Sequence, residues 1–86
     1  MKKRIDIYVR AEKDPLWHNV KVDVTRDFDA ALTTVAAKLD LKSGSFHLML
    51  VGGGLIERAN VLTPGDKLVA HLNEAEIEDQ HNPKLD

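Results

Sequence analysis

The hydrophobic residues of this chain change their spacing twice, and this change most constrains the fold. Over residues 4–12 every second residue is apolar, and the same alternation returns over residues 20–24. A period of two is typical of a strand with one buried face, and the break at Lys13-Asp14-Pro15 is typical of a turn. The sequence therefore predicts an antiparallel hairpin at the start of the chain.

From Phe28 onward the spacing is that of a helix. Apolar residues follow one another at helical intervals, on one stripe: Phe28, Leu32, Val35 and Leu39. Asp27 stands at the N-cap position, and Asp29 adds negative charge to the first turn, where the helix dipole favours it. We expect this helix to end before residues 42–45, with Gly44 as its left-handed stop.

After the helix the pattern returns to strands. Residues 46–51 and 67–72 are apolar runs, with a shorter segment over residues 55–62 between them. Thr63-Pro64-Gly65-Asp66 has the residues of a tight turn, with proline at the second position and glycine at the third. Two strands, a helix and further strands predict an α+β fold.

Three consecutive glycines, Gly52, Gly53 and Gly54, follow the first of these runs. A phosphate-binding loop would place a lysine and a hydroxyl residue directly before a helix, whereas Leu55 and Ile56 follow here. We therefore expect a bend in which one glycine adopts a positive φ and the strand reverses.

The composition fits a single domain. The chain has 86 residues, of which 43% are hydrophobic and 30% are charged, and this length leaves no room for a second core. No apolar stretch reaches the roughly 18–20 residues of a membrane span. The chain has no cysteine, which excludes thiol catalysis and cysteine-based metal sites. Without a continuous apolar leader segment, we expect a cytoplasmic protein.

The charge is distributed unevenly. Residues 1–72 carry 11 Lys or Arg against 9 Asp or Glu, which is +2, whereas residues 73–86 carry 1 against 5, which is −4. The body is therefore only mildly basic, far from the strong positive surface of a nucleic-acid-binding domain.

The order of the expected elements resembles the β-grasp fold of ubiquitin-like domains. FHLMLVGGGLI, residues 46–56, resembles the third strand and following turn of that family, and LTPGDKLVAHL, residues 62–72, resembles the approach to its last strand. The resemblance implies a mixed sheet of four to five strands crossed by one helix, in the order ββαβ(β)β. It places the domain in residues 1–72 and leaves residues 73–86 as a flexible acidic tail.

The resemblance also implies a binding function. Because the glycines are internal and the chain ends in Asn82-Pro83-Lys84-Leu85-Asp86, we expect no conjugation through a C-terminal diglycine. A non-conjugated ubiquitin-like domain would be a protein–protein interaction module of a scaffold or cytoskeletal assembly.

An alternative comes from DFDAALTTVAAKLDL, residues 27–41, which resembles the helix of doublecortin domains. This second resemblance implies a microtubule-binding or tubulin-binding domain, associated with the cytoskeleton. Its tubulin contact would be a basic end of the domain, formed by Lys2, Lys3, Arg4, Arg10 and Lys21.

Five residues are candidates for contacting a partner protein. If Leu48 and Leu50 face the helix, the intervening side chains face away from it and form an apolar and histidine patch on the open sheet face. Exposed methionine and valine rimmed by polar groups are typical of contact surfaces. The candidates are His47, Met49, Val69 and His71 in this patch, and Trp17 in the first loop.

Two other interpretations remain open. His47 and His71 are also consistent with two surface histidines on a sheet face, and the need to bury scarce aromatic area favours a Trp17 that caps the open end of the core together with Leu16. The four histidines show no metal-ligand spacing, and no catalytic triad or carboxylate pair is evident. We expect no enzyme, cofactor or metal, and a partner that is another protein rather than nucleic acid or membrane.

Overall fold

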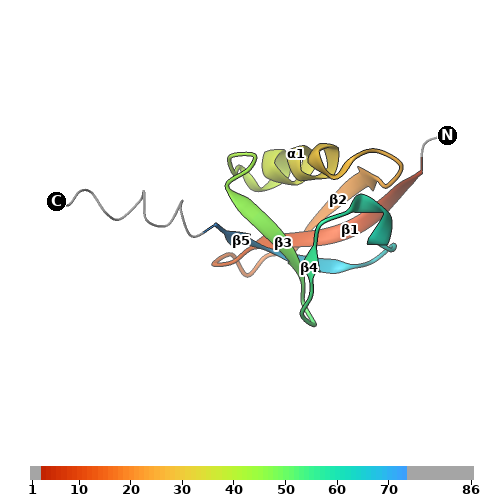
Figure 1. Ribbon diagram of the computed structural model, residues 1–86. Helices are drawn as coiled ribbons and strands as arrows, with labels where there is room; N and C mark the ends of the chain where they lie inside the picture. Colours follow the sequence, from red (N-terminus) through yellow and green to blue (C-terminus); the bar gives the residue numbers. More distant parts are fainter. Residues whose placement is uncertain (1–2, 74–86) are drawn as a thin grey trace.

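The computed structural model describes residues 3–73, which form one α+β unit (Figure 1). The elements follow in the order β1 (Arg4–Ala11), β2 (His18–Asp23), α1 (Phe28–Leu39), β3 (Phe46–Leu50), β4 (Leu55–Ile56), a short 3₁₀ helix η1 (Ala59–Val61) and β5 (Lys67–Leu72). The expected fold class, with one helix and a mixed sheet, is confirmed.

The sheet has five strands in the order β2-β1-β5-β3-β4. β5 lies between β1 and β3, parallel to β1 and antiparallel to β3, while the β1–β2 and β3–β4 pairs are antiparallel. The β3–β5 pairing places His47 opposite His71. α1 lies across one face of this sheet (Figure 1).

The core lies between α1 and the sheet, and the alternation along the strands explains it. β1 turns Ile5, Ile7 and Val9 toward the helix and buries all three, where they pack with Val35 and Leu48. Burial of this apolar surface is the main favourable contribution to folding. The remaining members of the predicted helix stripe are partly buried at the margin of the core: Phe28, Leu32 and Leu39.

The two ends of α1 differ in how well the sequence predicts them. The Asp27 side chain accepts a hydrogen bond from the Ala30 N–H at 3.1 Å, so the expected N-cap is confirmed. At the other end the predicted Gly44 stop is wrong. Asp40 adopts the left-handed conformation, with φ 58°, and its N–H bonds the carbonyl of Ala36. Aspartate is one of the few residues that tolerate this conformation, so the helix ends before Gly44, which lies in the turn leading to β3.

The glycine segment forms the turn between β3 and β4. Two of its glycines have a positive φ rather than one: Gly53 at 100° and Gly54 at 121°. The Leu50 N–H donates to the carbonyl of Gly54 at 3.0 Å, and the Gly53 N–H donates to the carbonyl of Leu50 at 2.9 Å. These bonds close the reversal and place β4 beside β3.

Asn73 is the last residue that the structure describes, and it contacts the turn that precedes β3. Its N–H donates to the carbonyl of Ser45 at 2.9 Å, and its side-chain amide donates to the carbonyl of Gly44 at 3.1 Å. The remainder of the predicted tail, residues 74–86, lies outside the described residues. Within residues 3–73, the single α-helix is too short and too polar to cross a lipid bilayer.

Candidate functional site

The sheet face opposite α1, here called the open face, is the main candidate for a functional surface. The strand register places Arg10 beside Val69, Val69 beside Met49, and Met49 beside Leu55, so one row of side chains crosses four strands. Among the residues of the open face are Tyr8, Arg10, His47, Met49, Leu55, Lys67, Val69 and His71.

The predicted patch is brought together, but its exposed part differs from the prediction. His47, Met49 and His71 are half-buried on the open face, whereas Val69, which we expected to be exposed, is only 7% exposed. β5 is an inner strand, so the side chains of Arg10 and Met49 flank Val69 on either side.

Two exposed apolar residues of the open face were not among the predicted partner contacts. Leu55 is 50% exposed and lies beside Met49 on the adjoining strand, and Tyr8 is exposed on β1 beside Lys67. The strand reversal expected at Gly52, Gly53 and Gly54 could have identified Leu55, because a tight turn there aligns Leu55 with Met49.

The two predicted histidines lie against each other. The rings of His47 and His71 are stacked, with centroids 5.6 Å apart and planes inclined by 19°. Nδ1 of His47 is 2.9 Å from the side-chain oxygen of Asn73, and Nδ1 of His71 is 3.4 Å from a carboxylate oxygen of Glu12. In the described part of the chain, no three His, Cys, Asp or Glu side chains are grouped so that they could hold a metal ion.

Trp17 lies at the open face and does not cap the core. The guanidinium carbon of Arg10 is 5.3 Å from the centroid of its ring, and Nζ of Lys67 is 5.7 Å from it, both within the range of cation–π attraction. The side chain remains 37% exposed, and its neighbour Leu16 is exposed as well. The interpretation in which Leu16 and Trp17 close the end of the core is therefore wrong.

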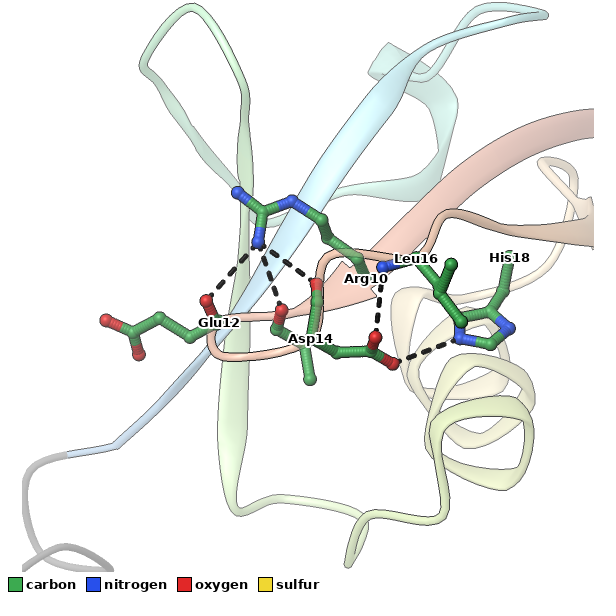
Figure 2. Close-up of polar contacts among 6 residues, drawn as sticks. Arg10, Glu12, Asp14, Leu16 and His18 are labelled. Atoms are coloured by element: carbon green, nitrogen blue, oxygen red, sulfur yellow. Dashed lines mark hydrogen bonds and ion pairs between the residues drawn. The ribbon is translucent and has the colours of Figure 1, made fainter.

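Arg10 also holds the loop that carries Trp17. Its Nη1 donates to the carbonyls of Ala11, Glu12 and Asp14, at 3.3, 3.3 and 3.2 Å (Figure 2). The loop therefore folds around the same guanidinium that contacts the Trp17 ring.

Asp14 anchors the other side of this loop. Its carboxylate accepts the Leu16 N–H at 2.9 Å and lies 3.3 Å from Nε2 of His18 (Figure 2). The Leu16 N–H, followed by the contact with His18, lowers the pKa of the Asp14 carboxyl below its ordinary value. Asp14 therefore holds both residues that flank Trp17 in the sequence, Leu16 and His18.

The basic end expected for tubulin binding does not form a single charged surface. Arg10 lies with Lys67 at the Trp17 ring, and Nζ of Lys21 is 2.7 Å from a carboxylate oxygen of Asp6. Arg4 lies opposite Asp23 in the β1–β2 register. Acidic neighbours therefore offset much of this positive charge, and Lys2 lies outside the described residues.

Comparison with known proteins gives a structural match. No protein-family model and no curated protein matches this chain. Among solved structures, a chain of the toluene 4-monooxygenase HD complex with the inhibitor 4-bromobenzoate matches with a TM-score of 0.64 and 18% identity. The match covers 83% of this chain and 100% of that chain. At this identity the match establishes a shared fold.

This match corrects the functional expectations from the sequence. The similar structure is a component of a monooxygenase complex, so the identification of a ubiquitin-like domain is wrong. The predicted scaffold or cytoskeletal role and the tubulin-binding alternative are wrong with it. A protein as partner remains consistent with a match to one chain of a multi-protein complex.

Proposed function

We propose that this protein is a small non-catalytic subunit that binds a protein partner within a multi-component oxygenase. The observation that carries the proposal is the match along the whole length of a chain from the toluene 4-monooxygenase complex. A shared fold of nearly the same extent is consistent with a shared position in such an assembly. We interpret the strand order, with β5 parallel to β1 and between β1 and β3, as a β-grasp arrangement.

The open face supports the proposal of a contact surface. Tyr8, Trp17 and Leu55 are exposed there next to the half-buried Met49, and charged side chains border them. Aromatic residues and arginine are enriched where binding energy is concentrated in protein interfaces. We therefore propose Trp17, His47, Met49 and His71 as partner contacts together with Tyr8 and Leu55, while Val69 supports them from below.

The polar groups of this surface favour contact over catalysis. Nδ1 of His47 faces Asn73, Nδ1 of His71 faces Glu12, and the Asp14 carboxylate is held by Leu16 and His18. We propose that these groups position loops and side chains, and that the chemistry belongs to the partner.

Recovery of the protein from its native cells tests the proposal. The tagged full chain is isolated under non-denaturing conditions, and its associated proteins are identified by mass spectrometry together with the mass of the assembly. We expect oxygenase subunits in constant stoichiometry with the wild-type chain, and loss of them with Leu55→Asp. The control is Val61→Asp, since Val61 is similarly exposed, at 53%, but belongs to η1 outside the sheet. A wild-type chain recovered free, or bound only to proteins unrelated to oxygenases, would contradict the proposal.

A further inference from the structure

We infer that the open face recognises an acidic and apolar partner surface, with a partner carboxylate seated at Arg10, Trp17 and Lys67. The inference rests on the proposed function and specifies the chemistry of the partner. It begins with an arrangement in which two cationic side chains, from β1 and β5, converge on one aromatic ring.

Among residues 3–73, neither Arg10 nor Lys67 has a carboxylate oxygen within 4.0 Å, and Asp14 acts on Arg10 only from a greater distance. Among residues 3–73, the ion pairs within 4.0 Å are Lys21 with Asp6, His18 with Asp14, and His71 with Glu12. Arg10 instead donates to three neutral carbonyls. Two positive charges held near one another therefore attract an anionic group from outside this unit.

The geometry of Arg10 favours a carboxylate as that group. Within residues 3–73, the hydrogen bonds of its guanidinium are all made by Nη1, which leaves Nη2 and Nε to donate (Figure 2). An arginine fork binds the two oxygens of a carboxylate with matching geometry. Lys67, whose Nζ also lies at the Trp17 ring, adds a second point charge.

The surroundings of the cluster specify the rest of the partner surface. The register places Tyr8 beside Lys67 and Val69 beside Arg10, and the apolar row continues to Met49 and Leu55. A carboxylate brought here by a partner with apolar neighbours would be partly removed from water, which strengthens its attraction to the cations. The partner segment is therefore expected to carry acidic side chains along the border of an apolar stripe, as an amphipathic helix can at the edge of its apolar face.

Peptide probes test the inference directly on the full chain. Three synthetic amphipathic helical peptides share the same apolar residues and carry Glu, Gln or Lys at the flanking positions. Binding is followed by the fluorescence of Trp17, the only tryptophan in the chain. We expect the Glu peptide to bind about tenfold more tightly than the Gln peptide at low ionic strength, with a preference that weakens as salt is added. The Lys peptide should bind most weakly.

Two variants test whether the preference for the Glu peptide depends on the charges at Arg10, Trp17 and Lys67. Lys67→Met retains an unbranched apolar stem but removes one of the two charges, so it should clearly reduce the preference for Glu over Gln, while Arg10 retains part of it. Lys38→Met removes a charge from the last turn of α1 and should leave the preference unchanged. Equal binding of the Glu and Gln peptides by the wild-type chain, or a preference that is the same in Lys67→Met as in wild type, would overturn the inference.

Two further results distinguish a partner carboxylate from the proposed function and from a contact within the chain. If the native assembly is recovered but the peptides show no charge preference, the inference is wrong and the proposed function stands. The chain's own acidic residues 74–86 could occupy the surface in place of a partner. In that case their removal would uncover Trp17, and its fluorescence would change in the direction opposite to the change that the Glu peptide causes. The inference of a partner carboxylate would then be overturned.

Discussion

At the scale of single residues, Arg10 connects the loop to the sheet face. It contacts the Trp17 ring and binds three loop carbonyls with one nitrogen. The strand alternation predicts that Arg10 points away from the core. This alternation could not predict the contact of Lys67 with the Trp17 ring, because Lys67 reaches that ring only through the parallel pairing of β1 with β5. Such contacts depend on strands that are far apart in the sequence.

The pH dependence of stability tests the anchoring of the loop by Asp14. Because the folded-state pKa of Asp14 lies below its unfolded value, the ionised carboxylate stabilises the folded chain above the unfolded pKa, about 3.9. This stabilisation is lost as the pH falls through the folded-state pKa. In urea unfolding, the free energy of unfolding of wild type should therefore exceed that of Asp14→Asn most clearly above about pH 4. This difference in stability should shrink toward zero in more acidic solution. A difference that stays constant with pH would rule out this role for the charge.

At the scale of elements, local sequence signals are most informative where the backbone strongly favours a few residue types. The Asp27 cap and the turn at Thr63-Pro64-Gly65-Asp66 form as expected, with Gly65 at φ 86° and the Asp66 N–H bonded to the carbonyl of Thr63. The end of α1 was misplaced because aspartate at position 40 takes the conformation that the pattern assigned to a later glycine. Because aspartate only tolerates the left-handed conformation, its presence at position 40 is a weaker signal of a helix end than a glycine would be.

The glycine turn between β3 and β4 gives a prediction at this scale. Gly53→Ala and Gly54→Ala should each destabilise the domain by about 1 kcal/mol or more, because a side chain is strained at their positive φ values. Gly52→Ala is the matched control, since Gly52 has no positive φ and a Cβ there would meet no atom within 4 Å. The measurement is thermal unfolding of the three variants. Equal melting temperatures for all three would show that the turn does not depend on glycine.

At the scale of the whole molecule, the order of strands decides which surface is available. The sequence predicts the elements and a patch that contains both His47 and His71, whose rings lie against each other in the structure. It does not predict that β5 is flanked on both sides, which buries Val69 and leaves Leu55 and Tyr8 as exposed apolar residues. The pattern of short elements also occurs in unrelated proteins, so it led to the wrong family.

Oxidative footprinting of the native assembly tests the central claim most directly. Tyr8, Trp17 and Met49 react readily with hydroxyl radicals and lie together at the open face, whereas Phe28 marks the start of α1. In the recovered assembly, we expect oxidation of the first three to be much slower than in the free chain, with Phe28 unchanged. Equal oxidation of Trp17 and Met49 in the free and assembled protein, or protection confined to Phe28, would contradict a partner bound at the open face.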